Sequence, residues 1–189
     1  MSETDFRLEQ EGSGFEFVLE QNRLRLTQIS SPLRNWLHPV LPSGLFGVTV
    51  NGRHYTSQDL TFTGREQHQP VDGLVEHVLY FEGEGWTVAQ VIRAFNQSGV
   101  WELEPRLINR GLAEMRVERI DSLDVTLIAG DLTILGFSGN WGSEFEPQPF
   151  KPYQHFVLES RSGRSSKGHH PFAAMFTPDG EALSLAVAW

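Results

Sequence analysis

The sequence predicts an all-β protein built from two antiparallel sheets packed face to face. Apolar and polar residues alternate over most of the chain, as in Phe15-Glu16-Phe17, and a period of two is typical of strands with one wet face. Turn-forming residues recur roughly every eight to twelve positions, which is the spacing of short strands in a sandwich. We find no convincing helical segment. We therefore expect one domain with little or no helix.

The expected strands follow one another from the N-terminus with short connections. They are centred on residues 6–8, 15–19, 24–26, 46–50, 53–55, 60–62, 74–81, 86–95, 101–109, 115–120, 125–128 and 132–135. Asn51-Gly52 is the clearest connection, because both central positions of a tight hairpin turn need positive φ. Residues 86–95 could form an amphipathic helix by spacing alone. Their β-branched content and their neighbours favour a strand.

Residues 30–44 interrupt the alternation and are expected to form a loop. Pro32, Pro39 and Pro42 lack the N–H group that a central strand needs. The loop also carries Trp36 and His38. One interpretation packs the Trp36 ring back onto the sheet, and the other makes it an exposed aromatic platform for a sugar or a partner surface.

The composition argues against several classes of partner. The chain has 189 residues and a formal net charge of −9, whereas nucleic acid and anionic membrane surfaces attract basic faces. Because there is no cysteine, there is no disulfide and no thiolate metal site, which is compatible with a cytoplasmic location. The first residues lack the layout of a signal peptide, and no apolar run is long enough to span a bilayer.

Motifs for catalysis and cofactor binding all fail on their chemistry. Residues 163–168 have the glycine spacing of a phosphate-binding loop, but His169 and His170 follow where Lys and Ser or Thr are required. Adjacent histidines on a strand point to opposite faces, so they are poor joint metal ligands. Ser165 and Ser166 lie near His169 without a nucleophile elbow, and no carboxylates form a recognisable acid–base pair. We expect no catalytic residue, no metal and no cofactor.

Two long connections in the last third of the chain combine aromatic and polar side chains. They carry Trp141, Arg161, Ser165, Ser166, His169 and His170. Arginine and serine in a glycine-rich segment often fix a loop by bonding buried carbonyl groups. A contact with a carbohydrate or with another domain is the alternative, because aromatic faces and planar donors suit both. Together with Trp36 and His38, these residues are the candidates for substrate or interdomain contact.

Three stretches in the chain carry a specific pattern. Residues 159–172 read E-S-R-S-G-R-S-S-K-G-H-H-P-F, residues 137–144 read F-S-G-N-W-G-S-E, and residues 108–111 read I-N-R-G. They resemble segments that read roughly E-S-R-R-G-x-S-S-H-x-x-N-P-F, L-S-G-x-W-G-R-E and I-x-N-x-G in family 36 glycoside hydrolases, the large microbial α-galactosidases. The order and spacing agree, and the resemblance is specific from about residue 74 onward.

The resemblance implies that residues 1–189 are a single β-supersandwich akin to the mutarotase fold. In the family this N-terminal domain precedes a (β/α)₈ barrel that carries two catalytic aspartates, and no such barrel is found here. The chain ends in a strand-like stretch, residues 182–189, so we expect a truncated or excised domain. The implied partners are that barrel, an α-galactoside or other carbohydrate, and a second copy in a homo-oligomer. The contact candidates would mainly fix the two connections and support the barrel.

The sequence also departs from the family pattern. Lys167 and His170 replace the usual His and Asn, and the Gly-Asp-Tyr/Phe-Arg stretch that reaches the sugar site in many members is not found. Another α-glycoside is therefore an alternative substrate for the parent enzyme. The alternative function is a free-standing carbohydrate-binding or mutarotase-like sandwich.

Overall fold

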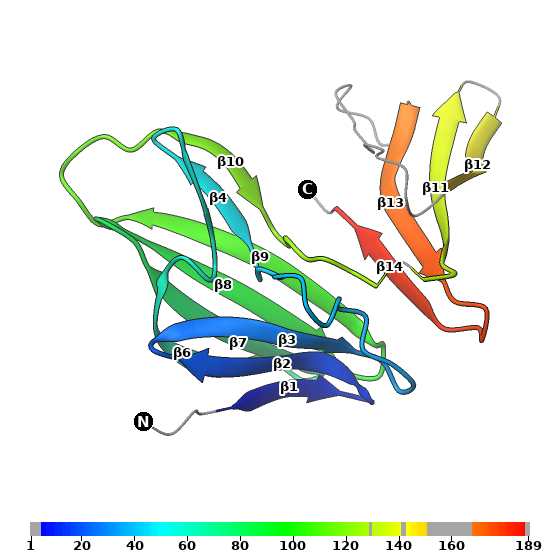
Figure 1. The fold of residues 1–189 in the computed structure, drawn as a ribbon, viewed down its shortest axis with the longest axis horizontal. Helices are drawn as coiled ribbons and strands as arrows, with labels where there is room; N and C mark the ends of the chain where they lie inside the picture. The colour runs from blue at the N-terminus through cyan, green and yellow to red at the C-terminus, as the bar shows by residue number, and fades with distance from the viewer. Residues whose placement is uncertain (1–4, 129, 141–142, 151–167, 188–189) are drawn as a thin grey trace. The chain divides into compact units, whose positions relative to one another are not determined.

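The structure is a computed structural model that describes residues 5–128, 130–140, 143–150 and 168–187. These residues contain fourteen strands and no helix, which confirms the all-β prediction (Figure 1). The strands are β1 (Phe6–Gln10), β2 (Ser13–Glu20), β3 (Arg23–Ser30), β4 (Gly47–Val50), β5 (Arg53–Thr56), β6 (Thr61–Val71), β7 (Leu74–Glu82), β8 (Trp86–Phe95), β9 (Val100–Asn109), β10 (Val117–Asp121), β11 (Thr133–Asn140), β12 (Ser143–Phe150), β13 (Gly168–Phe176) and β14 (Ala182–Ala186).

The chain forms two compact units. Unit 1 is Met1–Ile128 and holds β1 to β10, and unit 2 is Ala129–Trp189 and holds β11 to β14. Each unit has its own hydrogen-bonded sheets. A single domain spanning residues 1–189 stays a prediction.

Unit 1 is a sandwich of two layers. The sheets β1-β2-β3 and β10-β4-β5 form one layer, and the sheet β6-β7-β8-β9 forms the other (Figure 1). All pairings are antiparallel. Aromatic side chains join the layers, since the rings of Phe15 and Trp101 lie 5.1 Å apart and those of Tyr55 and Trp86 lie 5.4 Å apart, both edge to face.

The centre of unit 1 is a cluster of rings between these layers. Phe81 is fully buried, with its ring 5.0 Å from that of Phe46 and 5.6 Å from that of Phe62. Leu8, Phe17, Leu24, Leu45, Val48, Leu79, Val88 and Ile92 are also at most 2 % exposed. Burial of such side chains is the main favourable contribution to folding.

Local sequence explains the two elements that were hardest to assign. Asn51 and Gly52 have φ values of 51° and 78°, so they form the β4–β5 hairpin turn that this pair of residue types predicts. Residues 86–95 form β8, and neighbouring side chains such as Val91 and Ile92 are both fully buried. Because most side chains on both faces of this strand are buried, with Arg93 among the exceptions, the strand lacks the alternation that otherwise identifies one.

One predicted strand is wrong. Residues 125–128 form no ladder and make only isolated bridges, Leu37↔Leu127 and, just before the segment, Gly44↔Asp124. The segment instead runs beside the loop at 31–44, which supplies its backbone partners. Apolar content suited a strand at this position, but the neighbouring proline-containing loop cannot provide a continuous row of donors.

Unit 2 is one antiparallel sheet with the order β12-β11-β13-β14. The pairing of β11 with β13 shifts register between Gly136 and Ser138, and the pairing of β11 with β12 shifts between Ser138 and Asn140. Both irregularities fall near Ser138. Such bulges bend a strand and change where the following side chains point.

Gln90 is a buried polar side chain whose removal we expect to stabilise the protein. It is 0 % exposed, its Nε2 makes only a 3.4 Å contact with the Val91 carbonyl, and its Oε1 has no partner among the described residues. A buried oxygen without a donor costs about 1–3 kcal/mol, so Gln90→Met should raise the free energy of unfolding by about 1 kcal/mol in urea denaturation.

Gln58 supplies the matched control for that measurement. Its Nε2 donates to the Ser43 carbonyl at 2.7 Å, so Gln58→Met should lower the free energy of unfolding by about 1 kcal/mol. A loss of stability in Gln90→Met as well would show that the Gln90 amide is hydrogen-bonded in solution.

Candidate functional site

The loop at residues 31–44 holds the first two candidate residues and is fixed by the rest of unit 1. Trp36 donates its backbone N–H to the Ile29 carbonyl at 2.8 Å and accepts from Ile128 N–H at 2.9 Å. Its indole Nε1 donates to Ser31 Oγ at 3.1 Å, and the guanidinium carbon of Arg34 lies 4.9 Å from the ring centre. The side chain is only 2 % exposed, so it packs in the core of unit 1 rather than open to solvent.

His38 organises the tip of the same loop. Its Nδ1 accepts hydrogen bonds from the backbone N–H groups of Val40 at 3.2 Å and Leu41 at 3.0 Å. The His38 backbone N–H donates to the Thr126 carbonyl at 2.8 Å. An Nδ1 atom that accepts carries no proton, so the neutral ring has its N–H at Nε2. The imidazole therefore serves the turn through one nitrogen and offers a donor through the other.

Two polar residues that were not among the candidates also hold the loop at residues 31–44 in place by hydrogen bonds. Asn35 Oδ1 accepts from the N–H groups of Ile29 at 3.2 Å and Leu37 at 3.0 Å. Ser43 Oγ accepts from Thr126 N–H at 3.0 Å. Side-chain bonds to backbone groups of this kind replace the ladder that the prolines prevent. The result is a braced loop whose apolar residues Val40 and Leu41 are 83 % and 50 % exposed.

Unit 2 holds His170, the candidate that the structure places most clearly after Trp36 and His38. His170 lies on β13, is 4 % exposed, and contacts Phe145 of β12 with ring centres 4.2 Å apart and the ring planes tilted by 31°. Its Nε2 has no hydrogen-bond partner among the described residues. The ring centre of Phe137 lies 5.6 Å from that of Phe145 and 5.4 Å from that of Phe172.

Phe145 gives this ring cluster an unusual geometry. Its φ is 60°, in the left-handed region that side-chain-bearing residues rarely adopt, and 59 % of the residue is exposed. The strained backbone therefore holds an aromatic face at the surface with a buried imidazole beneath it. Such a ring can contact the apolar face of a sugar or the side chains of another domain.

The remaining candidates lie mostly outside what the structure describes. Trp141, Arg161, Ser165 and Ser166 are not among the described residues, and for His169 only its place on β13 is described. Trp36 and His38 belong to one braced loop of unit 1, whereas His169 and His170 are neighbours on a strand of unit 2. Contact with substrate or with another domain therefore stays a prediction for all eight candidates.

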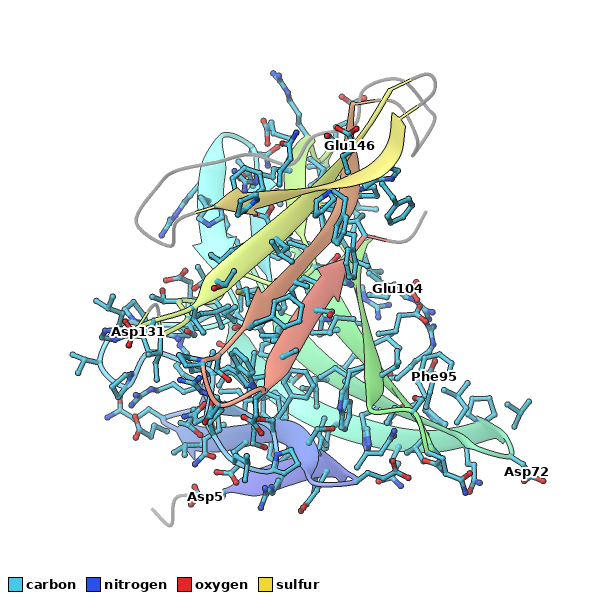
Figure 2. The ribbon with its side chains drawn as sticks, turned by 90° about the vertical axis from the view of Figure 1, so that its right-hand side faces the viewer. Asp5, Asp72, Phe95, Glu104, Asp131 and Glu146 are labelled. Carbon is cyan, nitrogen blue, oxygen red and sulfur yellow. The ribbon has the colours of Figure 1, made fainter. Side chains whose placement is uncertain are left out.

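A charged network lies on the outer face of β7, β8 and β9 in unit 1. Arg93 of β8 contacts Glu76 of β7 at 2.8 Å and, on β9, Glu102 at 2.6 Å and Glu104 at 2.8 Å. Hydrogen bonds from Arg106 first and Arg93 second lower the pKa of Glu104 from 4.5 to about 2. Figure 2 shows Glu104 on the side of β9 that faces away from the first layer.

The described residues contain no group of three or more His, Asp or Glu side chains that could hold a metal ion. None of the described segments is a helix long and apolar enough to cross a membrane.

Comparison with known proteins identifies relatives of the chain. A family model described as the glycosyl hydrolase family 36 N-terminal domain matches residues 65–189. A comparison with curated proteins gives no match.

Solved structures of α-galactosidases share this fold, and those from Geobacillus stearothermophilus are described as family 36 enzymes. One from Geobacillus stearothermophilus superposes with a TM-score of 0.71 at 16% identity, over 97% of this chain and 34% of that one. One from Lactobacillus brevis gives a TM-score of 0.67 at 15% identity, over 92% of this chain and 31% of that one. A variant enzyme from Geobacillus stearothermophilus, solved with raffinose, superposes with a TM-score of 0.67 at 15% identity. The match covers 96% of this chain and 33% of that one. The chain spans about a third of the length of these enzymes.

Proposed function

This chain belongs to the family of glycosyl hydrolase family 36 N-terminal domains, and from that premise we propose that it serves a longer enzyme as a non-catalytic domain. The longer enzyme would hydrolyse terminal α-galactosides or related α-glycosides. The observation that carries the proposal is the family match over residues 65–189. The solved relatives support it, because about two-thirds of their length lies outside the part that this chain matches.

The role proposed for this domain is to support a catalytic (β/α)₈ barrel. The braced loop at residues 31–44 supports that role, because Leu33, Val40 and Leu41 are 73 %, 83 % and 50 % exposed. Exposed apolar side chains that form a contiguous patch can mark a docking surface. The exposed Phe145 ring of unit 2 is a second such surface. A homo-oligomer and a cytoplasmic location complete the proposal.

Hydrolysis of a nitrophenyl α-galactoside tests the proposed function. We expect no turnover by the 189-residue chain and turnover by the same chain extended through the reading frame beyond codon 189. The matching β-galactoside is the control substrate and should resist both proteins. Turnover by the 189-residue chain alone would contradict the non-catalytic role.

The alternative is a free-standing carbohydrate-binding or mutarotase-like module. It requires an accessible aromatic or catalytic group. The Trp36 ring, which the sequence suggested as a platform, is buried in unit 1, whereas the Phe145 ring of unit 2 is exposed. We favour the domain of a longer enzyme because the family model matches residues 65–189.

A further inference from the structure

The tip of the proline-containing loop in unit 1 is closed by a side chain that can change its charge. His38 Nδ1 accepts hydrogen bonds from the N–H groups of Val40 at 3.2 Å and Leu41 at 3.0 Å. Neither N–H group has another acceptor among the described residues. Pro39 and Pro42 carry no N–H group, so the imidazole receives all the backbone donors of this tip.

The base of the loop is held in a different way. The His38 backbone N–H donates to the Thr126 carbonyl at 2.8 Å, and Gly44 N–H donates to the Asp124 carbonyl at 2.7 Å. Ser43 Oγ accepts from Thr126 N–H at 3.0 Å. Amides, carbonyls and hydroxyl groups do not change their charge between pH 5 and pH 8, whereas histidine does. Among these described contacts, only the closure of the tip therefore depends on a group that titrates.

A proton on Nδ1 would reverse the role of this atom. Neutral imidazole accepts through its unprotonated nitrogen, whereas both nitrogens of the charged ring are donors. The two N–H groups that point at Nδ1 would then lose their acceptor and would be repelled by the positive charge. Because they have no second acceptor, both would have to turn towards water, and the tip would lose the bonds that close it.

The charged side chains around the loop offer no replacement for these bonds. The loop itself carries Arg34, and the segments bonded to residues 38–44 carry Asp124 and Asp59. Asp124 lies 4.0 Å from the histidine of β5, and Asp59 accepts two hydrogen bonds within its own turn. No described carboxylate comes within 4.0 Å of a His38 nitrogen. Within the described part of the chain, a protonated ring would therefore gain no ion pair that offsets the lost hydrogen bonds.

We propose that His38 is a pH-dependent latch, which closes the loop tip while the ring is neutral and releases it when Nδ1 gains a proton. Val40 and Leu41 are 83 % and 50 % exposed, so the latch fixes two apolar side chains that project into solvent. The tip is closed above the pH range in which the ring is protonated and open below it, while the base of the loop stays bound. The inference goes beyond the proposed function, because it depends only on hydrogen bonds of this loop.

Nuclear magnetic resonance of the ¹⁵N-labelled 189-residue chain between about pH 8 and pH 5 tests the latch. At pH 8 the imidazole ¹⁵N signals should show an unprotonated His38 Nδ1. As the ring gains its proton, the Val40 and Leu41 amide proton signals should shift upfield with the same midpoint, because their hydrogen bonds are lost. The Gly44 amide, which is bonded to a carbonyl, should shift less.

Three results of this titration would each overturn the proposal. The first is an Nδ1 that is protonated at pH 8. The second is a His38 ring that stays neutral down to pH 5. The third is a ring that titrates while the Val40 and Leu41 amide signals stay in place.

His38→Asn keeps the closure and removes the titration. An asparagine oxygen can accept from N–H groups a few residues later, and this side chain does not change its charge. The Val40 and Leu41 signals of the variant should therefore stay near their native pH 8 positions throughout. His38→Phe keeps a ring without an acceptor and should show the released positions at both pH values.

His68→Asn is the matched control, because it removes a histidine of β6 that pairs with Glu66 instead of closing the loop. The titration of the Val40 and Leu41 signals should be unchanged in this variant. The same pH-dependent shifts in His38→Asn, with the native spectrum preserved elsewhere, would refute the assignment of the latch to His38.

Discussion

Phe81→Ala is expected to lower the free energy of unfolding by about 3–5 kcal/mol, since it removes a ring from a filled core and leaves a cavity. Phe81 is fully buried and contacts Phe46 and Phe62 from neighbouring elements of unit 1. Domains of this kind are stable by about 5–15 kcal/mol, so the loss is a large fraction of the total. Urea denaturation followed by tryptophan fluorescence measures it.

Two further variants make this prediction robust. Phe81→Leu keeps most of the volume and should cost about 1 kcal/mol, which gives a measurement even where the alanine variant does not fold. Leu112→Ala is the control, because Leu112 is fully exposed and its loss should change stability by less than about 0.5 kcal/mol. A small effect of Phe81→Ala would contradict the position of this ring in the core.

Arg93→Met is expected to lower the free energy of unfolding by about 1–3 kcal/mol at pH 7. This is less than for a fully buried ion pair, because part of the network is exposed to solvent. The Arg93 and Glu76 side chains are 16 % and 18 % exposed, so the substitution leaves the Glu76 carboxylate half-buried without its partner. Arg106→Met should cost at most about 1 kcal/mol, because that side chain is 49 % exposed. A double variant with Glu76→Gln should recover part of the loss.

The Arg93 effect should also depend on pH in a defined direction. The pKa of Glu104 is about 2 in the folded chain and 4.5 as its ordinary value, so its contribution is complete above pH 4.5 and lost as the pH falls towards 2. The part of the Arg93→Met difference that comes from Glu104 should therefore shrink over this window in urea titrations. Arg106→Met should show the same trend, because Arg106 is the first cause of the low pKa of Glu104. A difference that stays constant between pH 7 and pH 3 in both variants would contradict the role of Glu104 in the network.

Local patterns in the sequence predicted the strands of unit 1 except for residues 63–71, which extend β6 well beyond the predicted 60–62. Asn51-Gly52 specifies its hairpin because the backbone geometry of the turn depends on these two residues alone. The failure at residues 125–128 has the opposite cause, since whether an apolar segment forms a ladder depends on the partner that the fold places beside it. That partner is a loop about 85 positions earlier, which no local pattern identifies.

Some of the polar interactions described above could be predicted from neighbouring residues in the sequence, whereas others depend on the fold. The His38 cap could have been found in the sequence, because its imidazole bonds N–H groups only two and three residues later. Arg93 and its three carboxylates come from three strands, and they meet only because Arg93 is opposite both Glu76 and Glu102.

The hydrogen bond between Ser43 and Thr126 spans 83 residues, and it has a consequence for how the chain folds during synthesis. The loop at residues 31–44 emerges from the ribosome long before residues 124–128, so its bonds to that segment must wait while strands β4 to β10 are made, and only the local His38 cap can form early. Contacts between distant segments form late because loop closure must precede them. The attachment of this loop to residues 124–128 should thus be among the last steps of folding, and the loop should be among the first parts of unit 1 to open in hydrogen exchange.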